Sequence, residues 1–442
     1  MKDRCKIFGR IIFKEGLGNF LILLFVVLQS ENRFDSLRKM LYRELLTTEL
    51  DHQREDFRRF ADSQADDLAV YLDKLKQLNQ TTYADVQKKL DGKDAGAIPS
   101  DELNKLKTFS VLFSESWANH EEARSWANEV LQNRTTFAAD GSQLFSEREV
   151  SLPVGAIQIG WFENPHDRTQ RYEKSAYFEI LSPETLLREQ EEPINPETRV
   201  GERRFHAEVE KASEFLIKKK GWRERNEKMP LAFFDGTLLV SFSLPQTDLQ
   251  ETFIKKMVGL VKLSGETEVP IVGYVDRSYA RDLMNLLDTF DNAQTSNKQT
   301  IYDANILHAS TADFSQTLEN WGDRTCFCYS KRKGLSAFLD AETGESLVGF
   351  TYLQTTSEGA PARLDVPSWI YEKNLLNEVL DTVRAECVIG LGYPYALETA
   401  DQTAVITMRD REIFLRALQD FARREKLNFN VSRKVASKGR RR

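Results

Sequence analysis

Two aspartates, each followed by a glycine and a hydroxyl residue, are the first residues in this sequence that could do chemistry. Asp140 follows the apolar run Thr135–Ala139 in the order Asp-Gly-Ser, and Asp235 follows Leu231–Phe234 in the order Asp-Gly-Thr. Because glycine lets the chain turn sharply, we expect each aspartate at the tip of a strand with its carboxylate exposed. If the two strands are neighbours, the carboxylates lie side by side. The alternative is that each Asp-Gly pair simply makes a turn, which is common.

A glutamate on the helix expected between these strands could join the two aspartates. At ~100° per residue, three apolar residues of the segment Arg203–Lys220 fall within about 40° of Phe205: Val209, Ala212 and Leu216. Glu208 lies roughly 60° from Phe205, on the rim of that apolar face, from which it could reach the strand tips. Glu202, on the opposite rim, is its competitor. The alternative for Glu208 is a solvated residue at the boundary of the face.

Three acids from two strand tips and a helix form a donor set for Mg²⁺ or Mn²⁺, which prefer hard oxygen ligands. Two such ions ~3.5–4 Å apart activate a water and stabilise the leaving oxygen of a phosphodiester. Without a cation, clustered carboxylates repel one another and their pKa values rise. The pattern therefore predicts a two-ion site for phosphodiester hydrolysis.

Cysteine and histidine offer no competing metal site. The four cysteines form no CxxC motif, and Cys326-Phe-Cys328 alternates as a strand does. The five histidines show neither HxH nor HExxH spacing. This cysteine usage favours a reduced, cytoplasmic compartment. The formal net charge of −7 means that any DNA contact must come from a local patch, because a field of that sign repels phosphate.

The elements that would position these acids follow a ribonuclease-H-like order. From residue 135 the pattern predicts three strands, a helix, a strand, a helix and a strand, and the later strands need helical crossovers to run parallel. The segments are Thr135–Ala139, Val154–Trp161, Ala176–Leu181, Arg203–Lys220, Leu231–Phe234, Asp248–Leu263 and Val269–Val275. Strands at Thr325–Tyr329 and Ser346–Tyr352 and helices at Tyr371–Ala385 and Asp410–Arg424 follow. We therefore expect an α/β fold, a ribonuclease-H-like mixed sheet with flanking helices.

Four regions are predicted along the chain. Residues 1–39 are an extension with the short apolar run FLILLFVVL, which we interpret as an upstream translation extension; a membrane anchor is the less favoured alternative. Residues 40–132 show helical periodicity in separate stretches, with a break at Gly92, Gly96 and Pro99 and a second stretch over Leu103–Val111, and are expected to be an N-terminal helical arm for packing or dimerisation. Residues 133–425 are the α/β domain. Residues 426–442 are a basic tail, either a phosphate contact or a disordered solubilising segment.

Eight pieces of the α/β domain resemble the NurA family, in the order that the family shows. They are FAADGSQ (137–143), RRFHAEVEKA (203–212), LAFFDGTL (231–238), PIVGYVDRS (270–278), LENWGDRTCFCY (318–329), VGFTYLQT (348–355), RLDVP (363–367) and GYPYALETAD (392–401). The resemblance covers roughly residues 133–420. It implies a nuclease domain over 133–425 with activity on single- and double-stranded DNA ends, typically a 5′–3′ exonuclease that prefers Mn²⁺ and acts in DNA end resection and double-strand break repair. It also implies a single-strand endonuclease activity, a hexameric HerA-type ATPase as partner, and a homodimer.

The resemblance assigns roles to five residues. Asp140, Glu208 and Asp235 would be the metal ligands, and Tyr393 would lie beside the scissile phosphate. Asp401 stands where the family usually has histidine; an aspartate can bind metal but cannot donate a charged hydrogen bond.

Three further points follow from the sequence. Asp276 is a secondary candidate, with a turn at a strand end as its alternative. Asp401 leaves open a catalytically weakened scaffold that binds DNA and the ATPase. No G-x-x-x-x-G-K-[ST] motif occurs in the sequence, so we expect ATP hydrolysis to be left to the partner.

Overall fold

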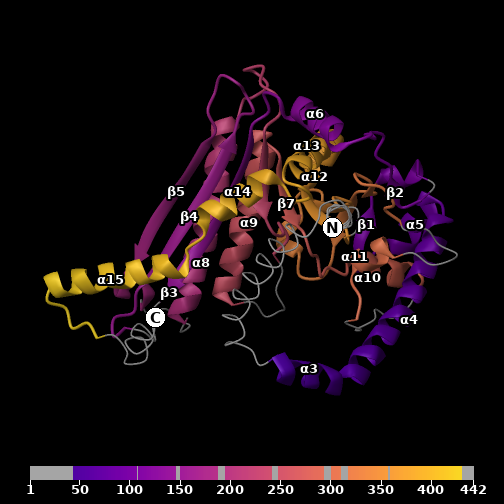
Figure 1. Ribbon diagram of the computed structural model, residues 1–442. Helices are drawn as coiled ribbons and strands as arrows, with labels where there is room; N and C mark the ends of the chain where they lie inside the picture. The colour runs from indigo at the N-terminus through magenta and orange to yellow at the C-terminus, as the bar shows by residue number, and fades with distance from the viewer. Residues whose placement is uncertain are drawn as a thin grey trace, which may run out of the picture. The chain divides into compact units, whose positions relative to one another are not determined.

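The computed structural model describes most of the chain after residue 42 (Figure 1). The described ranges are 43–106, 108–145, 150–187, 195–240, 247–292, 300–309, 317–356 and 359–430. The predicted extension over 1–39 and the basic tail after residue 430 lie outside these ranges. Within them, no helix has the length and apolar character needed to cross a bilayer. Internal contacts divide the chain into two units, 1–67 and 68–442.

Five strands form the core of the second unit. They are β3 (Thr136–Phe145), β4 (Gly155–Asn164), β5 (Glu173–Leu181), β6 (Leu231–Asp235) and β7 (Ile271–Val275). The first three make an antiparallel meander, then β6 runs parallel to β3 and β7 parallel to β6. Their spatial order is β7-β6-β3-β4-β5. The predicted element order and the mixed sheet are confirmed.

Helices cover both faces of this core (Figure 1). The crossovers are α8 (Pro196–Lys219) and α9 (Asp248–Thr267), and α14 (Tyr395–Ala404) packs on β3 and β4. Phe215 of α8 stacks on Phe137 of β3 with ring centroids 4.6 Å apart, whereas Tyr395 of α14 contacts Phe162 of β4. Phe137 pairs with Glu163, and side chains alternate along a strand, so Phe162 points to the opposite face. The helices α8 and α14 therefore lie on opposite faces of the sheet.

The sheet continues beyond β7 with strands from both the end and the beginning of the domain. In order they are β11 (Ala362–Pro367), β10 (Val348–Leu353), β9 (Cys328–Lys331) and β1 (Gly96–Pro99), with β8 (Arg324–Thr325) on β10 and β2 (Ser110–Val111) on β8. The expectation of a helical stretch over Leu103–Val111 is wrong: this segment contains only the end of the short 3-10 helix η1 (Asp101–Asn104) before β2. Helical spacing of apolar residues over so short a segment did not distinguish a buried turn and strand from a helix.

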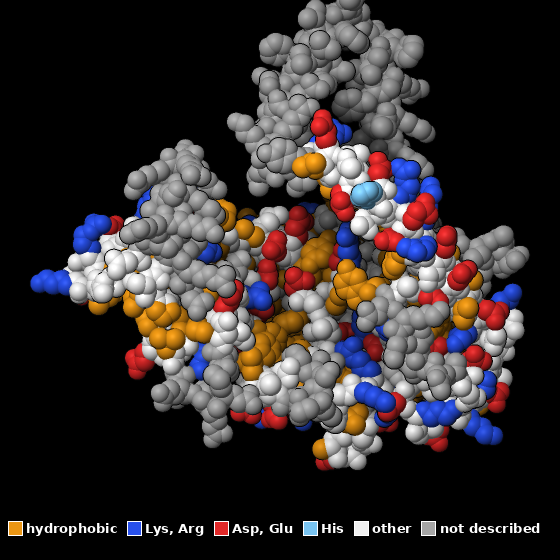
Figure 2. Space-filling view, turned by 90° about the horizontal axis from the view of Figure 1, so that it is seen from below, with side chains coloured by type: hydrophobic (Ala, Val, Ile, Leu, Met, Phe, Trp, Pro, Cys, Tyr) orange, Lys and Arg blue, Asp and Glu red, His pale blue; other side chains and the backbone are white. Residues whose placement is uncertain are grey.

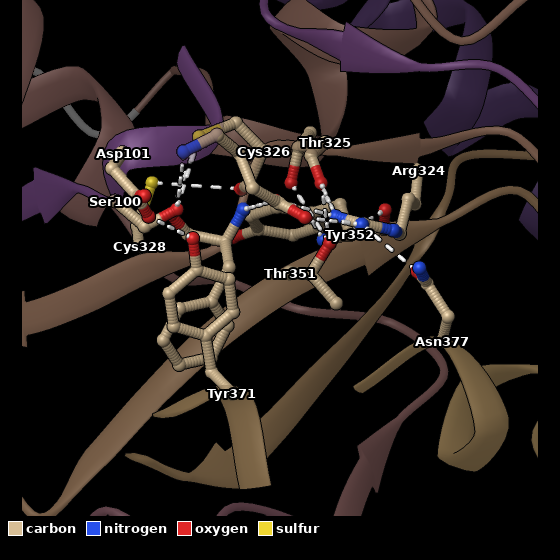
Figure 3. Close-up of polar contacts among 12 residues, drawn as sticks. Ser100, Asp101, Arg324, Thr325, Cys326, Cys328, Thr351, Tyr352, Tyr371 and Asn377 are labelled. Carbon is tan, nitrogen blue, oxygen red and sulfur yellow. Dashed lines mark hydrogen bonds and ion pairs between the residues drawn. The ribbon is translucent and has the colours of Figure 1, made fainter. Parts of the chain in front are cut away.

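Buried polar contacts tie this segment into the sheet (Figure 3). Arg324, 1% exposed, donates from Nη1 to Glu102 at 2.8 Å, and the amide of Phe327 donates to the same carboxylate at 2.9 Å. The hydroxyl of Tyr371 donates to Asp101. The buried charge of Arg324, paired in this way with the partly exposed Glu102, holds η1 against β8 and β9. The boundary between the two units falls inside α4 (Arg54–Asn79), after Asp67.

The described part of the first unit, residues 43–67, contains α3 (Arg43–His52) and the beginning of α4. Its apolar side chains, among them Leu45 and Phe57, are exposed. Ion pairs one turn apart, such as Arg58–Glu55 at 3.0 Å, stabilise these helices by a few tenths of a kcal/mol, roughly 0.2–0.5 each.

The remaining helices surround the extended sheet. They are α5 (Tyr83–Leu90), α6 (His120–Leu131), α7 (Pro183–Leu186), α10 (Asp282–Phe290), α11 (Asp303–His308), η2 (Ser336–Phe338), α12 (Ser368–Glu372), α13 (Leu376–Ile389) and α15 (Met408–Arg424).

Candidate metal centre

Asp140 lies in the middle of β3, so the prediction that it ends a strand is wrong. The hairpin with β4 continues past it, pairing Asp140 with Gly160 and running on to Phe145. The pairing of β3 with β6, on its other side, does end near this point: it extends only as far as Ala139, opposite Phe234. Beyond Ala139, therefore, β3 no longer pairs with β6 along that side.

Gly141 makes room for a helix side chain beside Asp140. A Cβ at this position would collide with Glu208 Oε1, with Cγ of Arg204 at 2.8 Å and with Cδ1 of Ile159 at 2.9 Å. The guanidinium of Arg204 donates to the carbonyl of Gly141 at 2.8 Å and lies 3.3 Å from the Glu208 carboxylate. The absent side chain thus lets α8 bring Glu208 next to Asp140. Sequence periodicity placed Glu208 at the rim of the apolar face, and its side chain is 13% exposed.

Asp235 stands at the end of β6, where the predicted turn does occur. Gly236 has φ of +108°, a conformation that favours glycine, and its amide donates to the carbonyl of Tyr274 at 2.9 Å. Because β6 pairs in parallel with β3, Asp235 emerges at the point where the β3–β6 pairing stops, one residue beyond the Ala139–Phe234 pair. The two aspartates are brought together as the sequence predicted, although only one of them is at a strand tip.

Asp401 reaches the site from α14, on the face of the sheet opposite α8 and Glu208. Gly160 of β4 pairs with Asp140, and a Cβ on Gly160 would lie 2.4 Å from the amide nitrogen of Ala404, so the last turn of α14 packs directly on this position. The charge of Asp401 adds to the rise in the pKa of Asp140 that burial causes, so the two carboxylates lie close enough to interact.

A buried glutamate, which no sequence pattern singled out, holds α14 in place. Glu386 of α13, 1% exposed, accepts from the Ala396 amide at 2.9 Å, at the beginning of α14, and from the Thr136 hydroxyl of β3 at 2.7 Å. His166 Nε2 lies 3.6 Å from the same carboxylate. Glu386 therefore links the beginning of α14 to the beginning of β3. In the sequence Glu386 stands between Ala385 and Cys387, and its role becomes visible only from its contacts in the structure.

Tyr393 and Asp276 complete the rim of the site. The Tyr393 hydroxyl donates to Asp235 Oδ1 at 3.3 Å, and its ring meets Tyr274 edge-on at a centroid distance of 5.2 Å. Asp276 follows β7 directly and acts on both Asp235 and Tyr393 through its charge. Burial raises the pKa of Glu202, the competitor of Glu208, and the charge of Arg199 opposes that rise.

Burial and mutual repulsion raise the pKa values of the acids. Burial raises the pKa of Asp140 to about 6; a backbone hydrogen bond from Gly141 opposes this, while the charges of Asp235 and Asp401 and the hydrogen bond with Asp401 add to it. Burial also raises the pKa of Asp235, reinforced by the charge of Asp401 and opposed by the Tyr393 hydroxyl. These groups act as one coupled set of acids.

Glu208 and Tyr393 are shifted in the same direction. Burial raises the pKa of Glu208 to about 7, with Arg204 opposing and the charges of Asp140 and Asp235 adding to the rise. Burial, followed by the charge of Asp235, raises the pKa of Tyr393 well above its ordinary value, so its hydroxyl keeps its proton at neutral pH. The site thus combines carboxylates that resist ionisation with one hydroxyl donor.

The donor chemistry of the site fits a hard divalent cation. Its carboxylate oxygens are the ligands that Mg²⁺ and Mn²⁺ prefer, and Glu208 Oε1 is buried without a hydrogen-bond partner. Among the described residues, however, no group of three or more Asp, Glu, His or Cys side chains is arranged to hold a metal ion. Asp140, Glu208, Asp235 and Asp401 are near enough to perturb one another but do not form a closed cage. Cys326, Cys328 and Cys387 are free and buried.

The fold and the site define an α/β protein with carboxylates gathered where two parallel strands cease to pair. The model of the NurA domain matches residues 134–406, and the chain belongs to the NurA family. The predicted family is confirmed.

Solved structures of low sequence identity resemble parts of the chain. A crystal structure of NurA with manganese has 10% identity and a TM-score of 0.36, covering 70% of this chain and 93% of that one. A crystal structure of NurA bound to dAMP and manganese has 10% identity and a TM-score of 0.30, covering 65% and 88%. The catalytic domain of human endonuclease V has 12% identity and a TM-score of 0.27, covering 70% and 92%. No curated protein matches the chain.

Proposed function

We propose that this protein is a Mn²⁺- or Mg²⁺-dependent DNA nuclease, a 5′–3′ exonuclease with single-strand endonuclease activity that acts in end resection and double-strand break repair. The observation that carries the proposal is the convergence of Asp140, Glu208, Asp235 and Asp401 from two strands and two helices on opposite faces of the sheet. Acids whose pKa values are raised by one another form a site that a cation would stabilise.

The four carboxylates would hold two ions, which when bound supply an activated water and neutralise the leaving oxygen of the phosphodiester. Arg204 keeps Glu208 beside β3 through its contacts with Glu208 and the Gly141 carbonyl. Tyr393, protonated and held against Asp235, is placed to donate a hydrogen bond to a phosphate oxygen. Asp401 cannot make the charged donation that a histidine would make there.

DNA would contact local groups of cationic side chains. Lysine and arginine side chains are interspersed with acidic and apolar side chains on the face in Figure 2. As partners we propose single- and double-stranded DNA ends, a hexameric HerA-type ATPase and a second copy of this chain, in the cytoplasm. The absence of a phosphate-binding loop motif in the sequence supports a separate motor. Exposed apolar side chains on the edge strand β5, such as Phe178 and Ile180, support self-association.

Cleavage of end-labelled linear DNA tests the proposal. With Mn²⁺, we expect the wild type to release nucleotides from 5′-labelled ends first, and Asp140→Ala to be slower by about 10³-fold or more, the scale expected when catalytic electrostatics are removed. Glu129→Ala, an exposed acid on α6, is the matched control and should cleave like the wild type. If neither the wild type nor its mixture with a HerA-type ATPase cleaves DNA, the nuclease proposal fails. The catalytically weakened scaffold, to which Asp401 points, would then be the better description.

A further inference from the structure

The loop that follows Asp235 crosses one strand to reach another. A Cβ on Gly273 of β7 would lie 2.6 Å from the carbonyl oxygen of Gly236 and 3.0 Å from the amide of Leu238. Gly273 pairs with Phe234 of β6 on one side and with Asp365 of β11 on the other. Because Gly273 has no side chain, residues 236–238 can pass over β7 at this point. The loop therefore extends from the candidate metal centre to β11.

A fully buried carboxylate receives the loop on the far side. Asp365, 0% exposed, accepts from the Leu238 amide at 3.1 Å and from the Thr237 hydroxyl, both through Oδ2. Its Oδ1 accepts from Arg363 Nε at 2.8 Å, and Arg363 Nη1 bonds in turn to the buried Asp282 at 2.6 Å. A buried charge is costly unless it is paired and hydrogen-bonded. Oδ2, the oxygen that Arg363 does not bind, accepts its two hydrogen bonds from the loop that follows Asp235.

We propose that Asp365, acting through Thr237, is a positioning residue that sets the direction of the Asp235 carboxylate; this inference rests on the proposed metal-dependent function. Asp365 lies two strands away from Asp235 in the sheet and reaches it only through the loop. Groups that orient a metal ligand without touching the ion tune metal affinity by about 10–100-fold. The RLDVP segment thus supports the site through Arg363 and Asp365 rather than through a ligand.

Thr237 allows the proposal to be tested without disturbing the core. Its side chain is on an exposed residue, so Thr237→Val removes the hydroxyl with little effect on packing, and Thr237→Ser keeps the hydroxyl. The readout is Mn²⁺ binding to the full chain without DNA, measured by the loss of the free Mn²⁺ electron paramagnetic resonance signal. We expect Thr237→Val to weaken Mn²⁺ binding by about 10-fold and Thr237→Ser to bind as the wild type does.

Asp365→Asn completes the set. It should also weaken Mn²⁺ binding, and the double variant with Thr237→Val should be no weaker than Asp365→Asn alone, because both changes remove the Thr237–Asp365 hydrogen bond through which Asp365 acts. Unchanged Mn²⁺ binding in Thr237→Val, or additive losses in the double variant, would overturn the proposal.

Amide hydrogen exchange on the metal-free protein separates this inference from the proposed function. The Leu238 amide should exchange at least about 10-fold faster in Thr237→Val than in Thr237→Ser, because the loop then keeps only the Leu238 amide, and no longer the Thr237 hydroxyl, on Asp365. If the wild type binds no Mn²⁺ while the exchange rates differ in this way, the metal-dependent function fails but Asp365 still positions the loop. Equal exchange rates in the two variants would sink the positioning role, whatever Mn²⁺ does.

Discussion

Asp140-Gly141-Ser142 and Asp235-Gly236-Thr237 share one sequence pattern, yet their backbones take different courses. At the first, the strand continues for five residues past the aspartate, paired with β4 all the way. At the second, the strand stops at the aspartate and Gly236 turns the chain with φ of +108°. The two glycines accordingly serve different purposes. Gly141 leaves space for Glu208 and Arg204, whereas Gly236 supplies a backbone conformation.

The difference shows that the neighbours of a strand, and not the Asp-Gly pair, decide whether the chain turns. Beyond Asp140 the backbone of β3 still finds hydrogen-bond partners in β4, since the hairpin extends to the Phe145–Gly155 pair. Beyond Asp235 the chain passes over Gly273 of β7, which has no side chain in the way, and the Leu238 amide then binds Asp365 of β11. These two contacts favour a loop that crosses β7 over a longer β6 strand. Both courses nevertheless deliver a carboxylate to the same place.

Replacing Gly141 should have the largest effect, because its role is to leave space. In Gly141→Ala the new methyl group would meet Glu208, Arg204 and Ile159 at once. We expect a stability loss of ~1–3 kcal/mol from overpacking and, because a small misplacement of a reacting group is costly, cleavage slower by about 100-fold. Single-turnover cleavage with Mn²⁺ and thermal unfolding measure the two effects.

The control for Gly141→Ala is a glycine where a methyl group fits. Gly259 in α9 has no heavy atom within 4 Å of the added Cβ, and alanine suits a helix better than glycine by roughly 0.5–1 kcal/mol. Gly259→Ala should therefore unfold at the same or a higher temperature and cleave normally. Wild-type cleavage by Gly141→Ala would show that Glu208 does not need this space.

Replacing Gly236 should have a smaller effect of a different kind, because its role is conformational. An added Cβ would meet nothing within 4 Å, but φ of +108° strains any other residue by about 1–3 kcal/mol. We expect Gly236→Ala to destabilise by that amount and to slow cleavage by about 10-fold, as the loop relaxes and Asp235 shifts.

Gly344→Ala separates strain from position. Gly344 also has positive φ, at +70°, and also has open space around the added Cβ, but it lies in the turn between Leu339 and Ser346. It should lose similar stability with no change in cleavage by the folded protein. Equal cleavage rates for Gly236→Ala and Gly344→Ala would show that the turn at Gly236 does not position Asp235.

The spacing of apolar residues predicted the strands and helices that are long enough to show a clear period. Contacts between segments distant in the sequence could not be predicted and became visible only in the structure. The meander, both crossovers and the rim position of Glu208 follow from apolar spacing, and the family resemblance selected Tyr393 and Asp401. Arg204, Glu386 and Asp365 could not be found in this way. Each acts across 60 to 250 residues of sequence, on Gly141, Thr136 and the Asp235 loop respectively, and a charged residue near an apolar segment carries no sign of such a partner.

The extent of β3 escaped prediction for a related reason. Asp-Gly-Ser is a common turn sequence, and only the pairing with β4 through Phe145 overrides it. The strands β1 and β2 were missed because each is short: Gly96 and Pro99 of β1 were read as a break between helices, and Val111 of β2 fitted a helical period.

The smallest expected effect is a pH dependence of stability and of metal binding that comes from Asp140 and Glu208. Asp140, with its pKa raised to about 6, and Glu208, with its pKa raised to about 7, both lie above the usual ~3.9 and ~4.3 of the unfolded chain. In the metal-free protein, each group therefore stabilises the fold most below pH ~4, and that contribution is lost as the pH rises through 6 to 7. A cation must displace the same protons, so its binding should strengthen over this range. We expect saturating Mn²⁺ to raise the unfolding temperature by on the order of 3 °C at pH 8 and by much less at pH 5.5. The Mn²⁺ shift should depend on Asp140.

Asp140→Asn should unfold at a higher temperature than the wild type at pH 8 without metal, because it removes a negative charge that the charges of Asp235 and Asp401 repel. The variant should also lose most of the Mn²⁺ response. A Mn²⁺ shift of equal size at both pH values would mean that the ion binds elsewhere, and that the two Asp-Gly sites converge for a reason other than metal binding.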